Sequence, residues 1–131
     1  MKLFSLPGLG LYIMFLFILL GCKEKLECNF EVVDLLCEYA SNPTAINTNK
    51  PNFSWKILSD KRNILQKSYQ IMVASSPELL DVELPDYWNS GKVNSSRSVN
   101  IVYSGKPLQS NSDYYWKVKV WIGKSCYKTS E

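Results

Sequence analysis

The chain has 131 residues, enough for one domain, and its 46% hydrophobic and 13% aromatic residues are typical of a globular protein with a packed core. The net charge of +3 is spread along the chain, which argues against nucleic acid as a partner. There is no histidine, and none of the four cysteines forms a CxxC pair, so we expect no metal site, no bound cofactor and no catalytic residue.

Residues 1–22, with the sequence MKLFSLPGLGLYIMFLFILLGC, form a predicted targeting segment. The apolar run from Leu9 to Leu20 suits a secretory signal and is short for a membrane span, which needs about 20 residues. The run ends in Leu-Leu-Gly-Cys, which resembles the lipobox of bacterial lipoproteins. We therefore predict lipidation at Cys22, a membrane contact through the lipid anchor, a polar tether over residues 23–29 and a place in the cell envelope, either periplasmic or on the cell surface. An ordinary cleaved signal and an uncleaved anchor are the alternatives.

The rest of the chain, residues 30–131, alternates polar and apolar residues in short stretches that turn residues interrupt every eight to twelve positions. This spacing predicts an all-β domain with about seven strands, an antiparallel β-sandwich of the immunoglobulin-like or fibronectin type III-like kind. The expected strands cover residues 33–39, 53–57, 68–73, 86–93, 97–103, 114–122 and 125–130. Residues 75–81 are expected to form one helical turn, with Ser76 as its cap and Pro77 at its first position.

Four aromatic residues fall at positions where the alternation predicts a buried side chain: Trp55, Tyr69, Tyr114 and Trp116. Leu108 precedes Tyr114 by six residues, and apolar residues then recur at every second position. This pattern resembles the tyrosine corner of fibronectin type III domains, in which the tyrosine hydroxyl bonds to the backbone at the corner. We interpret these residues as structural core.

Three other aromatic residues are expected to face outward. Tyr115 and Trp121 are out of phase with Trp116, and Trp88 stands near a turn. Exposed aromatic rings can stack on sugars or pack against a neighbouring domain, and the sequence leaves both roles open.

The three cysteines after Cys22 allow two arrangements. Cys37 is in phase with Val33 and Leu35, so we expect it in the core, reduced, in preference to a Cys37–Cys126 disulfide. Cys28 lies in the predicted tether and is expected to be an exposed, reactive thiol.

Three phrases together resemble the N-terminal domain of bacterial α-L-rhamnosidases, glycoside hydrolase family 78: CEYASNPTAINTNKPNFSW (37–55), SYQIMVASSPELL (68–80) and YWNSGKVNSSRSVNIVYSGKPLQSNSDYYWKVKVW (87–121). In such enzymes this domain is an accessory β-sandwich ahead of a helical barrel that carries the catalytic carboxylates. The resemblance implies a non-catalytic part of an enzyme that removes terminal α-L-rhamnose from glycans.

The resemblance also implies that the barrel is absent from this chain, which we therefore expect to be truncated or split and inactive alone. Its expected partners are the catalytic domains of the same or an adjacent chain, and rhamnose-containing glycans. The alternative is a free-standing, lipid-anchored module that binds a glycan or a protein.

Overall fold

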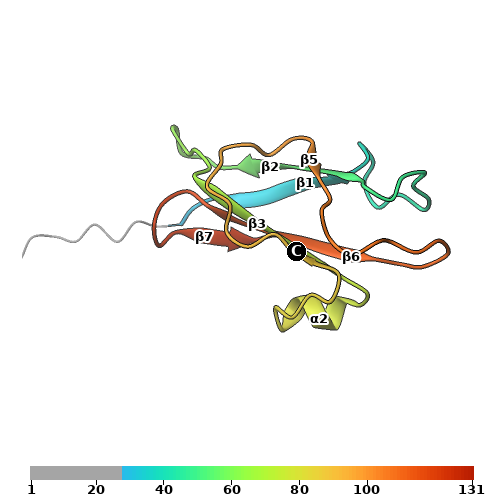
Figure 1. Ribbon diagram of the computed structural model, residues 1–131. Helices are drawn as coiled ribbons and strands as arrows, with labels where there is room; N and C mark the ends of the chain where they lie inside the picture. The colour runs from blue at the N-terminus through green and yellow to red at the C-terminus, as the bar shows by residue number, and fades with distance from the viewer. Residues whose placement is uncertain (1–27) are drawn as a thin grey trace, which may run out of the picture.

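The computed structural model describes residues 28–131, which fold into two antiparallel sheets packed face to face (Figure 1). One sheet has three strands in the order β1-β2-β5, and the other has four in the order β4-β3-β6-β7. This confirms the predicted all-β sandwich. The strands are β1 (Glu31–Cys37), β2 (Asn52–Leu58), β3 (Ser68–Ala74), β4 (Trp88–Asn89), β5 (Ile101–Val102), β6 (Tyr115–Trp121) and β7 (Tyr127–Thr129), and one short helix, α2, spans Pro77–Asp81.

The predicted signal segment, Cys22 and residues 23–27 of the predicted tether lie outside the described residues. Within residues 28–131, no helix has the length and apolar character that a membrane crossing requires. Asn29 belongs to the sandwich, because its side chain donates a hydrogen bond to Asp60 and its carbonyl accepts one from Ser59. Cys28 is tied to the sandwich as well, through its disulfide to Cys126.

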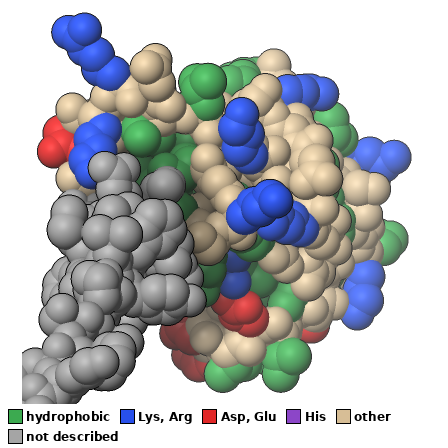
Figure 2. Space-filling model, turned by 90° about the vertical axis from the view of Figure 1, so that its left-hand side faces the viewer, with side chains coloured by type: hydrophobic (Ala, Val, Ile, Leu, Met, Phe, Trp, Pro, Cys, Tyr) green, Lys and Arg blue, Asp and Glu red, His purple; other side chains and the backbone are tan. Residues whose placement is uncertain are grey.

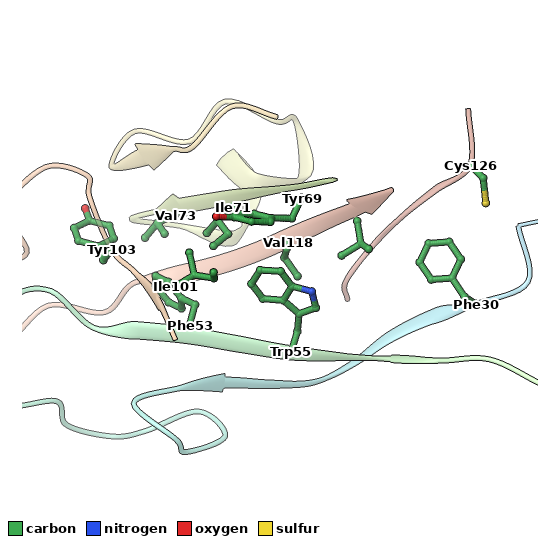
Figure 3. Packing of buried hydrophobic residues seen from close by; sticks show 11 residues of the cluster. Phe30, Phe53, Trp55, Tyr69, Ile71, Val73, Ile101, Tyr103, Val118 and Cys126 are labelled. Carbon is green, nitrogen blue, oxygen red and sulfur yellow. The ribbon is translucent and has the colours of Figure 1, made fainter. Parts of the chain in front are cut away.

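The core lies between the sheets and is built by alternate residues of the long strands (Figure 3). β2 contributes Phe53 and Trp55, which point at the residues that β3 and β6 direct inward. Those residues are Tyr69, Ile71 and Val73 from β3 and Val118 and Val120 from β6. The alternation expected for these three strands is present in the structure.

β3 is buried on both of its faces. Met72 and Ala74 point away from the main core, and α2 covers them with Leu80. The predicted helical turn is therefore present and has Pro77 in its first turn, but Ser76 makes no side-chain capping hydrogen bond. Because α2 covers the outer face of β3 and the other sheet covers the inner face, β3 carries apolar residues at successive positions.

β1 contains a bulge that changes which residues face the core. Between Val33 and Leu36 the pairing advances by three residues on β1 and by two on β2, and Asp34 adopts a left-handed backbone with φ 51°. Val32 and Cys37 consequently pack against the core. The prediction that Val33 shares a face with Cys37 is wrong, because the extra residue reverses the phase within the strand.

A disulfide joins Cys28, just before β1, to Cys126 in the turn between β6 and β7, with 5.4 Å between the two Cα atoms. The expectation of a reactive Cys28 thiol is therefore wrong, and the alternative Cys37–Cys126 bridge is wrong as well. Cys37 is free, as predicted, and half-buried at the far end of β1. Burial and the neighbouring Glu38 carboxylate raise the pKa of its thiol to about 11.

Candidate functional site on the outer face of the four-stranded sheet

The outward side chains of β6 form the centre of the candidate surface. Trp116, Val118 and Val120 point toward the core, so the residues between them point away from it. The outward set is Tyr115, Lys117, Lys119 and Trp121. β7 adds Tyr127 directly opposite Trp121.

Trp121 and Tyr127 gather two lysines into a small cluster. Their ring centroids are 5.8 Å apart. The Nζ of Lys92 lies 4.6 Å from the centroid of Trp121, and the Nζ of Lys119 lies 5.2 Å from the centroid of Tyr127. Each ring thus carries an ammonium group over one face, which stabilises the pair and leaves less ring area open to a sugar. We call these four residues the Trp121 cluster.

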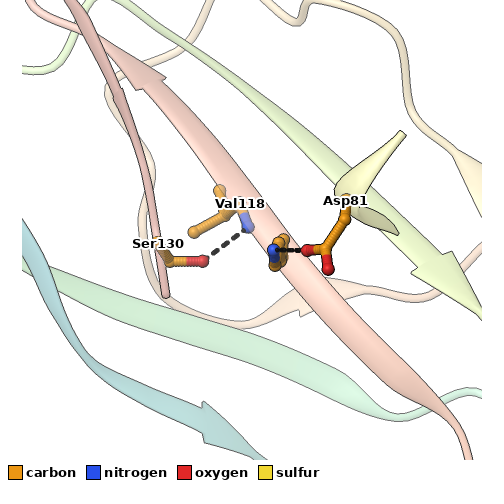
Figure 4. A network of polar contacts seen from close by, with 4 residues as sticks. Asp81, Val118 and Ser130 are labelled. Carbon is orange, nitrogen blue, oxygen red and sulfur yellow. Dashed lines mark hydrogen bonds and ion pairs between the residues drawn. The ribbon is translucent and has the colours of Figure 1, made fainter. Parts of the chain in front are cut away.

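The middle of the same face is closed by α2 and the residues after it. Lys117 donates to the Asp81 carboxylate at 2.6 Å (Figure 4), and Lys119 forms an ion pair with Glu83. Figure 4 also shows the hydroxyl of Ser130, just after β7, at the backbone amide of Val118, which donates to it at 3.0 Å. These contacts fix the last strand onto β6 and leave no continuous flat platform across the sheet.

The predicted outward aromatic residues do not form one site. Tyr115 is 42% exposed but lies at the opposite end of β6 from Trp121, about 20 Å away at a strand rise of roughly 3.3 Å per residue. Trp88 pairs with Val73 and packs against Phe53, with 6.3 Å between ring centroids. Trp88 therefore belongs to the margin of the core, whereas Trp121 lies on the outer surface.

The predicted core residue Trp55 is 1% exposed and anchors a polar network that the sequence did not reveal. Its indole N–H donates to the side-chain oxygen of buried Gln66 at 2.9 Å. The Gln66 amide then donates to the carbonyls of Ser95 and Arg97. Gln66 thus ties the segment between β4 and β5 to the core, and no sequence pattern singled it out. Beside this network lies a groove of about 840 Å³.

The predicted tyrosine corner has the expected geometry. The hydroxyl oxygen of Tyr114 accepts a hydrogen bond from the backbone amide of Gln109 at 2.8 Å, which lowers the pKa of Tyr114. Its ring meets that of Tyr87 edge-on, with 4.7 Å between centroids. Tyr114 and Trp116 are half-buried against the core, and Trp116 lies 4.5 Å from Phe53 between ring centroids. Tyr69 is buried and meets Trp55 edge-on.

Residues 103–107, with the sequence YSGKP, form a tight turn that packs against Trp88. The Tyr103 hydroxyl donates to the carbonyl of Lys106 at 2.6 Å, and burial raises the pKa of Tyr103 to about 12. A Cβ on Gly105 would lie 2.5 Å from the Cβ of Trp88 and 2.5 Å from the Tyr103 hydroxyl. Only glycine fits at this position, so this turn is a packing feature.

Several carboxylates of the described domain are engaged in structural contacts. Asp34 pairs with Lys56, and Asp86 accepts hydrogen bonds from the hydroxyl and the backbone amide of Ser75. These two bonds lower the pKa of Asp86. Among residues 28–131, no three His, Cys, Asp or Glu side chains are grouped so that they could hold a metal ion. The contacts of Asp34 and Asp86 hold neighbouring segments of the sandwich together.

Comparison with known proteins places this sandwich in a family. A family model described as the Rha78A-like N-terminal immunoglobulin domain matches residues 32–131. The chain belongs to this family. It is 45% identical over 103 residues to an α-L-rhamnosidase of Formosa agariphila, which covers 77% of this chain and 11% of that protein. An α-L-rhamnosidase of Streptomyces avermitilis is 40% identical over 84 residues, which cover 64% of this chain and 8% of the relative.

Two solved structures carry a similar domain. The crystal structure of the Streptomyces avermitilis α-L-rhamnosidase complexed with L-rhamnose aligns with a TM-score of 0.68 and 36% identity, covering 78% of this chain and 10% of the other. The structure of the α-L-rhamnosidase from Dictyoglumus thermophilum aligns with a TM-score of 0.66 and 41% identity, covering 70% of this chain and 10% of the other. The chain thus spans about a tenth of the length of the relatives that it matches.

Proposed function

We propose that this Rha78A-like domain is the non-catalytic N-terminal accessory sandwich of an α-L-rhamnosidase that removes terminal α-L-rhamnose from glycans. The observation that carries the proposal is the match to an N-terminal domain of that family over residues 32–131. The chain corresponds to only 11% of its 45% identical relative. We propose catalytic domains of the same or an adjacent chain as its partners.

The sequence segments that resemble the rhamnosidase family have structural roles in this domain, which supports an accessory function. The Trp55 indole holds Gln66, Gly105 lies against Trp88, and the Asp86 carboxylate accepts from Ser75. Residues that are used in this way stabilise the sandwich and are not presented to a substrate. A rigid sandwich of this kind can position or stabilise a larger catalytic part.

The test compares the isolated domain with the protein present in the native cells. Residues 23–131 should not hydrolyse an aryl α-L-rhamnoside, while an antibody against the sandwich should detect a polypeptide or complex that also contains a helical catalytic part. The DNA after codon 131 should encode that part in frame or in the adjacent gene. Hydrolysis by the folded domain above the level of a Trp55→Ala control would refute the accessory function.

We also propose that Cys22 carries lipid and holds the domain at the cell envelope. The support is the apolar run that ends in Leu-Leu-Gly-Cys. Labelled fatty acid should be incorporated by the wild-type chain in a bacterial host and not by Cys22→Ser. Equal labelling of both chains would refute lipidation.

A second candidate function is a free-standing glycan-binding module, which the Trp121 cluster favours because it presents two aromatic rings on the surface. Titration with rhamnose-containing oligosaccharides should then change the tryptophan fluorescence. Trp121→Ala should abolish the change, and Tyr115→Ala, at the other end of β6, should preserve it. A change that survives Trp121→Ala would contradict this candidate.

A further inference from the structure

One end of the sandwich collects segments that are far apart in the sequence. Glu31, at the start of β1, pairs with Leu58 at the end of β2. The Lys67 amide donates to the carbonyl of Trp121, which brings the β2–β3 turn beside the β6–β7 turn. The disulfide from Cys28 to Cys126 closes the same end. We call this region the disulfide end: residues 28–31, 58–67 and 121–127, with Lys92 over Trp121.

The disulfide end carries a local excess of positive charge. Its five basic residues are Lys61, Arg62, Lys67, Lys92 and Lys124, and its two acids are Glu31 and Asp60. The other described residues between 28 and 131 include seven basic and eight acidic side chains, so the remainder is slightly negative. Figure 2 looks at this end and shows Lys and Arg side chains spread over the surface, with acidic side chains on the left and in the lower part of the view.

Exposed apolar side chains lie among these charges. Leu65 in the β2–β3 turn is 65% exposed, Leu58 is 57% exposed and Tyr127 is 52% exposed. Trp121 stands next to Tyr127. Basic residues mixed with leucine, tryptophan and tyrosine are the composition that favours the boundary between lipid headgroups and acyl chains.

The chain leaves the described domain from this same end. Cys28 is fixed by the disulfide, and Cys22 precedes it by six residues, which can span at most about 20 Å when fully extended. Residues 23–27 contain two lysines and two glutamates, so their charges cancel. If Cys22 is lipidated as proposed above, this short segment keeps the disulfide end of the domain nearest to the membrane. β7 starts at the disulfide end and runs away from it, toward the end that carries the β5–β6 turn (Figure 1).

We propose that the disulfide end is a membrane-docking surface that binds the anionic headgroups of the lipid bilayer in which the protein is anchored. Basic side chains near such a surface contribute electrostatic attraction, and each one raises the partition coefficient about fivefold at moderate ionic strength. The exposed leucines and Tyr127 add apolar contact. Docking would hold the sandwich in one orientation, with the β5–β6 turn directed away from the membrane.

The test measures binding of residues 23–131, which contain both sheets, the core and the disulfide, to lipid vesicles in the absence of any acyl chain. Vesicles of phosphatidylcholine mixed with an equal part of phosphatidylglycerol should bind the domain, and vesicles of phosphatidylcholine alone should not. Binding should weaken as the salt concentration rises. Because the protein used here has no lipid, the result does not depend on whether Cys22 is modified.

Two variants with the same change in net charge locate the surface. Lys67→Gln/Lys124→Gln, at the disulfide end, should lower the partition coefficient about 25-fold. Lys50→Gln/Lys106→Gln, in exposed turns at the opposite end, should lower it less than twofold. Equal losses in both variants, no binding to anionic vesicles, or binding only to an acidic polysaccharide would each overturn the proposal.

Discussion

Removing the disulfide should destabilise the domain by several kcal/mol. In the double variant Cys28→Ser/Cys126→Ala, the folded state loses the covalent link between the segment before β1 and the β6–β7 turn. The two cysteines are 98 residues apart in the sequence, and the chain-entropy model for a loop of that length gives about 4.7 kcal/mol at 25 °C. This figure compares with a total stability of about 5–15 kcal/mol for a typical domain.

The assay is guanidinium unfolding of residues 23–131, followed by tryptophan fluorescence under oxidising conditions. We expect a lower midpoint and a steeper dependence on denaturant, because the unfolded chain without the link exposes more surface. The melting temperature should fall by about 20 °C. Titration of the unfolded wild-type domain with a thiol reagent should find one free thiol, that of Cys37.

The matched control is Cys37→Ala, which removes a half-buried free thiol and should cost about 1 kcal/mol. The reasoning is refuted if the double variant and the control have the same stability, or if three free thiols are found in the unfolded wild-type domain. Either result would mean that packing alone holds the segment before β1 against the β6–β7 turn.

Three further changes test individual contacts. Trp55→Phe should lower the unfolding free energy by about 2 kcal/mol, because the buried Gln66 oxygen loses its indole donor; an unchanged denaturation midpoint would contradict the network. Gly105→Ala should cost about 1–3 kcal/mol in a thermal melt through its clash with Trp88, and full stability would show that the turn has room for a methyl group. The folded state lowers the pKa of Asp86, so its contribution to stability is present above the unfolded pKa of about 3.9 and is lost as the pH falls below it. Asp86→Asn should therefore lower stability at neutral pH and reduce the loss on acidification, and an identical acid profile would disprove this contribution.

The sequence predicted the sandwich because its signals are local. Alternation along β2, β3 and β6 follows directly from which side chains face the other sheet. The tyrosine corner is also local, since the bond from the amide of Gln109 to the Tyr114 hydroxyl spans five residues. Such features depend only on neighbouring positions and therefore leave a pattern.

The features that the sequence did not predict depend on contacts between distant segments. The bulge near Asp34 appears only in the pairing of β1 with β2. Cys28 meets Cys126 because β1 starts at the same end of the sandwich as the turn between β6 and β7. The spacing of cysteines along the sequence does not reveal which strands share an end. Trp88 looked like a surface residue because it stands near a turn, but its pairing with Val73 directs it inward.

The bulge in β1 has a consequence for self-association. The outermost strands of the two sheets are β1, β5, β4 and β7, and three of them are too short to present a long row of free backbone groups. β1 is the exception with seven residues, and it is there that Asp34 breaks the regular ladder with a left-handed backbone and places a carboxylate paired with Lys56. An irregular, charged edge strand does not pair with a strand from a second molecule. The only long edge strand among the described residues is therefore protected against the edge-to-edge pairing that leads β-proteins into fibrils.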